Sequence, residues 1–242
     1  MLKRFARLFG YELIRKTKMP TLEAHLLKVL NCYKPDVVID VGANIGQFGM
    51  MLRSLGYKGR IVSFEPVEAT FQSLKKTASH DDLWDVYNFG LGHHKHKAEI
   101  NVFEKTVFSS ILDPSEFGKS RYAHMNSPIK QEINIDTLDN FIDENGLLEN
   151  RIFLKMDTQG FDLQVFRGSG KTLNNVVALM SEISFEHIYD GMPGYHQSLV
   201  EYEKAGFSMT GLFPITRRAD GGLIEMDCVL INKKFSVSDF PR

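Results

Sequence analysis

Short apolar segments alternate with amphipathic helical stretches along most of this chain. Residues 37–43 and 60–65 read as buried strands, and helical stretches follow them at 47–55 and 66–78. Such alternation is typical of βαβ units, whose crossover helices cover both faces of a parallel sheet. The sequence therefore predicts an α/β fold, a doubly wound sheet in a single domain.

Further strands and helices are predicted downstream. Strands are expected at 84–91, 98–104 (antiparallel), 151–157, 175–183, 207–213 and 224–232, and helices at 136–145 and 196–205. The last two strands can pair antiparallel across the turn Asp220-Gly221-Gly222. Parallel strands followed by such a terminal hairpin resemble the sheet of about seven strands in class I methyltransferases, which are Rossmann-like.

The length of 242 residues suits one large domain. We divide the chain into a basic amphipathic segment (1–34), the main domain (35–233) and a C-terminal tail (234–242). Within the main domain, residues 106–130 are predicted to be mostly irregular and to form a lid over the substrate, because long loops are usually functional or disordered.

The composition and net charge of the chain limit the kinds of partner and cellular setting that we expect for it. With 43% hydrophobic and 24% charged residues the chain is an ordinary globular protein, and a net charge of −1 gives no field that would attract nucleic acid. Two cysteines give no metal spacing or disulfide framework, which suits a reducing compartment. No apolar stretch approaches the roughly 18 residues of a membrane span, and no signal peptide is recognised. We expect a cytoplasmic setting.

The first residues form a separate pattern. Residues 2–16 place apolar side chains at helical spacing (Leu2, Phe5, Leu8, Phe9, Leu13 and Ile14) among basic ones (Lys3, Arg4, Arg7, Arg15 and Lys16). A basic amphipathic helix can lie on an anionic membrane on the cytoplasmic face. It can equally pack on its own domain or on a second subunit, so a peripheral membrane contact and a homo-oligomer contact stay open.

The sharpest local signal is the turn Asp40-Val41-Gly42-Ala43-Asn44-Ile45-Gly46, between a predicted strand and a predicted helix that begins at Gln47. Glycines allow a tight turn and close approach to a ligand, and the helix start offers free N–H donors. Glu65 ends the next strand 23 residues after Gly42, where an acid accepts hydrogen bonds from ribose. Candidate cofactor residues are Asp40, Gly42, Ala43, Asn44, Gly46, Gln47, Glu65 and Pro66.

Two ligands could use this turn. A dinucleotide fold needs glycine at the position of Asn44 to make room for a pyrophosphate, so that fingerprint fails. S-adenosylmethionine has no phosphate and tolerates the polar Asn44, and Asp40 could contact its ammonium group directly or through water.

Together, Asp40–Gly46, Phe64-Glu65-Pro66, Lys155–Asp162 and Ser181-Glu182-Ile183 resemble motifs of the FkbM family of methyltransferases, over roughly residues 35–232. The most specific is Lys-x-Asp-x-Gln/Glu-Gly-x-Glu/Asp, in which Asp162 replaces the commoner Glu. The resemblance implies an S-adenosylmethionine-dependent O-methyltransferase, acting on sugar hydroxyls of glycans or glycosylated metabolites.

Methyl transfer to an alcohol needs a group that takes the hydroxyl proton. Asp157 ends the strand 151–157 and is a candidate general base, metal ligand or substrate anchor; Lys155 lies on the same sheet face and needs a partner if buried. Glu182, near the end of the neighbouring strand, is expected to converge on Asp157, where the pair could share a proton or bind Mg²⁺ or Mn²⁺. His187 is the best-placed histidine for proton transfer.

Two other functions remain open at this stage. A nicotinamide-dependent oxidoreductase would use a similar turn, although Asn44 and the terminal hairpin argue against it. A non-catalytic cofactor-binding protein would not need both Asp157 and Glu182. His93, His94 and His96 read as a solvated turn, because Lys95 and Lys97 are interleaved with them.

Overall fold

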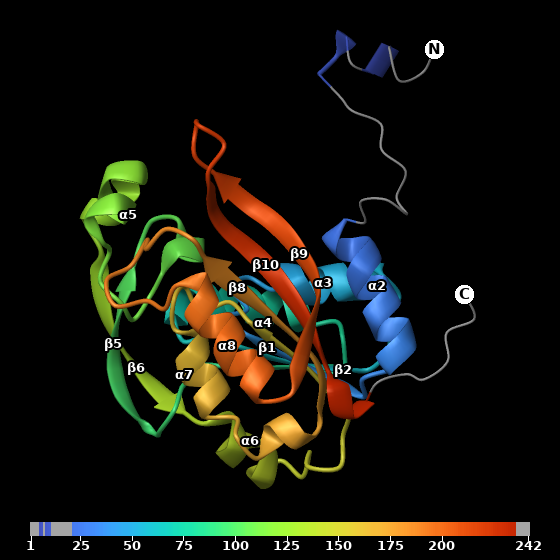
Figure 1. Cartoon of the computed structure of the whole chain (residues 1–242). Helices are drawn as coiled ribbons and strands as arrows, with labels where there is room; N and C mark the ends of the chain where they lie inside the picture. The colour runs from blue at the N-terminus through green and yellow to red at the C-terminus, as the bar shows by residue number, and fades with distance from the viewer. Residues whose placement is uncertain (1–4, 7, 11–20, 236–242) are drawn as a thin grey trace.

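The computed structural model describes residues 5–6, 8–10 and 21–235 (Figure 1). Most of the predicted amphipathic segment 2–16 and most of the tail 234–242 therefore lie outside the described residues. The first long helix, α2 (Leu22–Tyr33), begins after Thr21, whose hydroxyl accepts a hydrogen bond from the Ala24 amide at 3.3 Å. Such a cap satisfies one of the free N–H groups at a helix start.

A seven-stranded sheet forms the centre of the molecule, in the order β3-β2-β1-β7-β8-β10-β9. Its strands are β1 (Val37–Val41), β2 (Arg60–Phe64), β3 (Trp84–Tyr87), β7 (Ile152–Met156), β8 (Val176–Ser184), β9 (Phe207–Arg217) and β10 (Leu223–Asn232). The first five in this list are parallel, whereas β10 is antiparallel to both β8 and β9. Both the class I methyltransferase fold and its terminal hairpin are confirmed.

Both faces of the sheet are covered by helices. Val37, Ile39 and Val41 of β1 pack in one core with α6 (Leu138–Glu144) and α7 (Asp162–Arg167). Val38 points the other way, into a second core with α2 and α3 (Gln47–Ser54). Successive strand residues face opposite sides, so a strand buried on both faces is apolar throughout. In residues 21–235 the other α-helices are α4 (Glu68–Ala78), α5 (Glu116–Arg121) and α8 (Tyr195–Lys204).

A second sheet of three strands lies beside the first (Figure 1), in the order β4-β6-β5. It consists of β4 (Gly90–Leu91), β5 (His96–Val102) and β6 (Ile129–Asp136). Two predictions were wrong here. The strand expected at 84–91 divides between the two sheets, and residues 106–130 are less irregular than expected, since they contain α5 and the start of β6. Pairing with β5, which is distant in sequence, makes β6 a strand.

Helix α7 was not predicted, because it has only six residues and follows directly on the β7 loop. The predicted turn of the terminal hairpin is present, closed by a hydrogen bond from the Arg218 amide to the Gly222 carbonyl at 2.8 Å. Within the described part of the chain, no helix is both long and apolar enough to cross a membrane.

Candidate functional site

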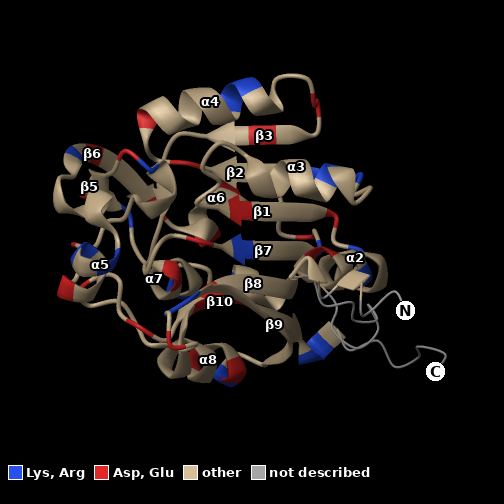
Figure 2. Ribbon diagram, turned by 90° about the horizontal axis from the view of Figure 1, so that it is seen from above, with Lys and Arg blue, Asp and Glu red and all other residues tan. Residues whose placement is uncertain are grey.

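A cleft of about 460 Å³ opens at the carboxyl ends of the parallel strands. Its walls come from residues 41–44 and 64–66, from 106–109, from 157–159 and from Thr216, Glu225 and Asp227 of the hairpin. In open α/β sheets ligands bind at this edge, where loops from neighbouring strands converge. Figure 2 shows the strand order from above, with the acidic position of β1 next to the basic position of β7.

The turn after β1 lies against the end of β7. Gly42 has a φ of +74°, and a Cβ on it would lie 2.0 Å from the carbonyl oxygen of Asp157. Asn44 also has a positive φ, +49°, which is uncommon for a residue other than glycine. Only glycine fits at position 42, so the turn can pack directly against the Asp157 peptide group.

Glu65, at the end of β2, holds this turn in place. Its carboxylate accepts hydrogen bonds from the Asn44 amide at 3.0 Å and from the Val67 amide at 2.9 Å. The side chain is nearly buried yet lines the cleft. Burial raises the pKa of Glu65 to about 7, although both backbone donors favour the charged form. A carboxylate has lone pairs beyond these two bonds, so Glu65 can also accept hydrogen bonds from a ligand.

The cleft fits the adenosyl end of S-adenosylmethionine. Pro66, Leu91, Ile100 and Ile135 give an apolar wall beside Glu65, which suits a planar ring next to ribose hydroxyls. Ala43, Asn44 and Gln47 line the cleft as well. Six of the eight predicted cofactor residues are therefore at the cleft: Gly42, Ala43, Asn44, Gln47, Glu65 and Pro66.

Asp40 is not at the cleft, and the predicted contact with the cofactor ammonium was wrong as a direct one. The side chain is fully buried and does not line the cavity. Its Oδ1 lies 2.9 Å from the Lys155 ammonium, and its Oδ2 accepts a hydrogen bond from the Ser63 hydroxyl at 3.2 Å. Burying a charge requires a paired charge, so Asp40 acts as the counter-ion of Lys155.

Gly46 is likewise away from the cleft. It is the N-cap of α3, with a φ of +95°, and a Cβ there would lie 3.1–3.2 Å from Leu74, Thr77 and Trp84. Its left-handed φ explains the glycine at this position, whereas the close approach of α3 to Trp84 depends on Gly49.

Asp157 and Glu182 converge as predicted, on the amide of Gln159. Gln159 Nε2 donates to Asp157 Oδ1 at 3.1 Å and to Glu182 Oε2 at 3.3 Å. Asp157 also lies 3.5 Å from the Lys155 ammonium, and 39% of its side chain is exposed toward the cleft. Lys155 itself is almost fully buried; it donates to the Gly42 carbonyl at 3.0 Å, so it holds the cofactor turn and Asp157 together.

Glu225 and Asp227 line the same end of the cleft but were not among the site residues predicted from the sequence. The sequence pattern that could have identified them is a pair of acids two residues apart in the mostly apolar strand 223–232. Burial, together with the nearby Asp157, raises the pKa of Asp227 to about 7. Burial and the adjacent Glu225 raise the pKa of Glu182 well above its usual range. Glu182 and Asp227 therefore remain at least partly protonated near neutral pH.

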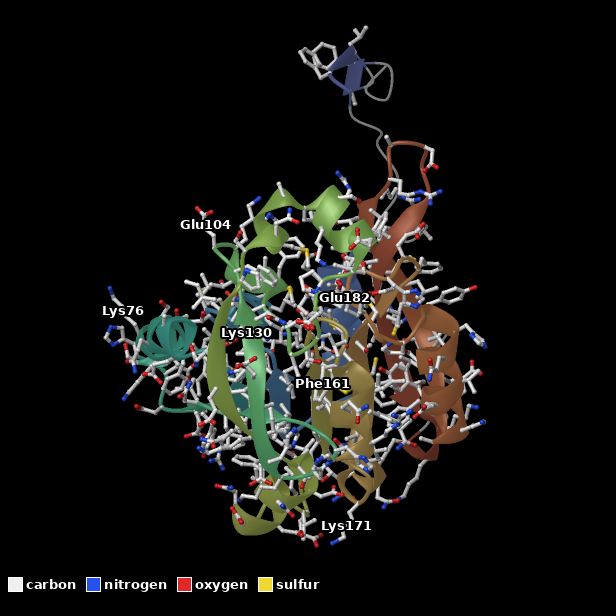
Figure 3. All side chains as sticks on the ribbon, turned by 90° about the vertical axis from the view of Figure 1, so that its left-hand side faces the viewer. Lys76, Glu104, Lys130, Phe161, Lys171 and Glu182 are labelled. Atoms are coloured by element: carbon white, nitrogen blue, oxygen red, sulfur yellow. The ribbon has the colours of Figure 1, made fainter. Side chains whose placement is uncertain are left out.

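His187 lies outside the cleft, which contradicts its predicted role in proton transfer there. The side chain is exposed and lines a separate shallow surface hollow beside α8. The reason is that Ile188 and Tyr189, which follow it, turn inward and are fully buried. In Figure 3 the labelled Glu182 lies near the middle of the molecule, whereas Lys76, Glu104 and Lys171 lie toward its edges.

The predicted cation site at Asp157 and Glu182 gains no support. Among residues 5–6, 8–10 and 21–235, no group of three or more His, Cys, Asp or Glu side chains is arranged to hold a metal ion. His93 and His94 are exposed at the turn before β5, as expected for a solvated turn.

The sequence model of the methyltransferase FkbM domain matches residues 40–209. This chain belongs to that family. Its membership and the antiparallel hairpin both weigh against the nicotinamide-dependent alternative.

Relatives of this FkbM protein are distant. A protein named Methyltransferase 1 from Beauveria bassiana is 23% identical over 142 residues, which cover 54% of this chain and 57% of that protein. The chain thus matches little more than half the length of this relative. The 2-O-methyltransferase NoeI of Sinorhizobium fredii is 25% identical over 180 residues, 71% of this chain and 73% of NoeI. The structure of magnesium protoporphyrin IX methyltransferase (ChlM) from Synechocystis PCC 6803 is 7% identical, with a TM-score of 0.49 over 96% of this chain and 91% of that one.

The last acid of the FkbM motif, Asp162, has a structural task in this protein. It is buried and accepts hydrogen bonds from the Thr158 amide at 2.8 Å, the Ser181 hydroxyl at 2.7 Å and the Glu182 amide at 3.2 Å. These bonds join the β7 loop to β8. Asp162 therefore fixes the backbone that carries Asp157 and Glu182.

Proposed function

We propose that this protein is an S-adenosylmethionine-dependent O-methyltransferase whose acceptor is a saccharide hydroxyl of a glycan or glycosylated metabolite. One observation carries the proposal: the glycine turn with Glu65 and the Asp157–Glu182 pair open onto a single cleft and touch each other through Gly42 and the Asp157 carbonyl. The methyl donor and the proton acceptor would therefore be adjacent.

S-adenosylmethionine, when bound, supplies a methyl group on a sulfonium, which is an electrophile for an alcohol oxygen. The residues that would hold it are Glu65 toward the ribose, Asn44 and Gln47 at the turn, and the apolar wall near Pro66 toward the adenine. The backbone of Gly42 and Ala43 completes the cradle. The protein must bring the acceptor oxygen within about 3 Å of the methyl carbon.

Asp157 is the proposed general base. Of the two carboxylates that pair with Lys155, Asp157 is the exposed one, and it lies where the turn meets β7. A sugar hydroxyl is a poor nucleophile until its proton is removed or stabilised, and a positioned carboxylate does this. Glu182, held by the same Gln159 amide, would accept a second hydrogen bond from the acceptor.

The saccharide class has two supports. The acceptor end of the cleft combines carboxyl groups with the Gln159 amide and the Thr216 hydroxyl, groups that exchange hydrogen bonds with alcohols. In addition, the relative NoeI carries the name 2-O-methyltransferase.

A label-transfer assay tests the proposal. The protein is incubated with S-adenosylmethionine labelled in its methyl group and with a deproteinised oligosaccharide fraction from its source cells, and Asp157→Asn serves as the control. We expect alkali-stable label in the oligosaccharides with the wild type only. Cofactor binding without transfer to any fraction would favour a non-catalytic binding protein, and label on carboxylates or amines would overturn the O-methyl assignment.

Two expectations about the setting remain part of this proposal, namely the cytoplasmic location and a contact through residues 2–16 with a membrane or a second subunit. Cell fractionation and light scattering of the full chain and of a chain without residues 2–16 would test them. Equal distribution and equal mass of the two forms would argue against any such contact.

A further inference from the structure

Gln159 has an unusual backbone conformation at the edge of the cleft. Its φ is +53°, in the left-handed region that residues other than glycine seldom adopt, and Gly160 follows with +92°. The Gln159 carbonyl accepts a hydrogen bond from the buried Ser110 hydroxyl at 2.7 Å. Strained backbone persists where the surroundings fix it, and it is concentrated at functional sites.

The side-chain amide of Gln159 donates hydrogen bonds to two carboxyl groups at the acceptor end of the cleft, those of Asp157 and Glu182. They lie 3.1 Å (Asp157 Oδ1) and 3.3 Å (Glu182 Oε2) from Nε2. A neutral donor between two acids reduces their repulsion and fixes their separation. Gln159 therefore determines how these two side chains face the cleft.

The amide of Gln159 is in turn oriented by Tyr189. This tyrosine is fully buried, and its hydroxyl lies 3.0 Å from Gln159 Oε1 and 2.7 Å from the Phe108 carbonyl. A phenol has one proton and here has two acceptors, so its bond to Gln159 depends on where the Phe108 carbonyl is.

Phe108 belongs to residues 106–110, the first part of the predicted lid, and this segment also touches the cofactor turn. Asn44 Nδ2 donates to the Thr106 hydroxyl at 3.1 Å. Segment 106–110 thus contacts both ends of the cleft, at Asn44 on the cofactor side and through Tyr189 and Ser110 on the acceptor side.

We propose that Gln159 is a positioning residue that holds Asp157 and Glu182 as one acceptor-binding pair, and that segment 106–110 sets its orientation through Tyr189. The inference rests on the proposed function, because it gives the pair a role toward an acceptor. The contact of this segment with the cofactor turn, from Thr106 to Asn44, would then be coupled to the arrangement of the acceptor site at the opposite end.

Several charged groups face the pair and contribute to its titration. They come from β7, α7 and β10 and are Lys155, Asp162, Glu225 and Asp227. A test must therefore compare variants that leave all of these unchanged.

The first measurement is the titration of Glu182, followed by its ¹³Cδ resonance in the full-length protein with S-adenosylhomocysteine bound. Gln159→Met keeps the volume but removes the amide, so the charged form loses a donor. We expect the pKa of Glu182 to rise further. Gln197→Met, on the exposed face of α8, is the matched control and should leave this titration unchanged. An unchanged or lower pKa in Gln159→Met would overturn the positioning role.

The second measurement tests whether segment 106–110 is linked to the acceptor pair through Tyr189. Tyr189→Phe keeps the ring and removes only the hydroxyl, so it is expected to fold. It should speed amide hydrogen exchange in residues 106–110 by at least about tenfold and also shift the Glu182 titration. Faster exchange without a change in the titration, or neither change, would refute the link. Neither measurement involves methyl transfer, so failure of the proposed reaction would leave both results interpretable.

Discussion

The Lys155 ammonium lies 2.9 Å from Asp40 Oδ1 in the interior of the sheet and 3.5 Å from Asp157 Oδ2 at the edge of the cleft. Burial alone lowers the pKa of a lysine, but the two carboxylates outweigh burial and raise the pKa of Lys155. The same ammonium donates to the Gly42 carbonyl. One buried cation therefore connects the strand core, the cofactor turn and the proposed base.

Replacing Lys155 should chiefly lower the free energy of unfolding of the protein. Lys155→Met leaves Asp40 buried without a charged partner, and we expect a loss of about 3–5 kcal/mol in the free energy of unfolding. Denaturant titration measures it. The double variant with Asp40→Leu should recover much of the loss, whereas the exposed Lys171→Met should change stability by less than about 0.5 kcal/mol. Lys155→Met as stable as wild type would show that the pair is not needed for folding.

Glu65 should control cofactor affinity. Glu65→Ala removes the proposed ribose acceptor and the two hydrogen bonds that hold Asn44 and Val67. We expect binding of S-adenosylhomocysteine to weaken at least about tenfold, equivalent to about 1.4 kcal/mol, in calorimetry. Glu68→Ala, on the exposed side of α4, is the control. Unchanged affinity in Glu65→Ala would refute the ribose assignment.

Asp157 should matter for turnover rather than for cofactor binding. Asp157→Asn keeps the shape of the side chain but cannot take a proton, and a general base contributes about 10²–10⁴-fold. We expect turnover with the oligosaccharide acceptor to fall by a factor in that range, while S-adenosylhomocysteine binds within about twofold of wild type. Near-normal turnover in a folded variant would exclude the role.

The raised pKa of Asp227 predicts that the stability of the protein depends on pH. Its folded pKa of about 7 lies above the ordinary 3.8, so the folded state binds this proton more tightly than the unfolded state. The stabilising contribution of Asp227 is complete below about pH 4 and is lost as the pH rises through 7. Asp227→Asn should therefore raise stability at pH 8 by on the order of 1–3 kcal/mol and much less at pH 4. Urea unfolding at both pH values, with Glu203→Gln as an exposed control, checks the sign; a variant destabilised at pH 8 would contradict it.

Chelation should leave the reaction intact. The Gln159 amide occupies the position between Asp157 and Glu182 where a cation would have to bind. We expect turnover after exhaustive EDTA treatment to stay within about twofold of the untreated enzyme. Activity that is lost and then restored by Mg²⁺ or Mn²⁺ would show instead that a divalent cation displaces the amide and lowers the pKa of the bound hydroxyl.

The parts of the fold that follow local patterns were predictable from the sequence. Strands β1 and β7 are buried on both faces, and the mostly apolar composition of the predicted segments 37–43 and 151–157 indicates this. By contrast, β6 becomes a strand by pairing with β5, some thirty residues earlier, so its own residues give little signal. Tertiary pairing of this kind overrides local propensity.

The site shows the same division. Gly42 and Glu65 were predictable because backbone geometry and strand-end position set their roles. Asp40 was misassigned because a charge at a strand end can point toward a ligand or toward a neighbouring strand, and here the partner Lys155 occupies the paired position on β7. His187 was misassigned because the direction of a loop depends on which of its neighbours is buried.

The contact between Gly42 and the Asp157 carbonyl limits how this enzyme could be redesigned. Loops that select the acceptor are the usual place to change the specificity of an α/β enzyme. Here the loop that begins at Asp157 shares its first peptide group with the support of the methyl donor site. Any exchange of residues 157–160 that moves this peptide would therefore alter donor affinity along with acceptor choice. The hairpin residues 215–216, which line the cleft but make no such contact, are the better starting point for changing the acceptor alone.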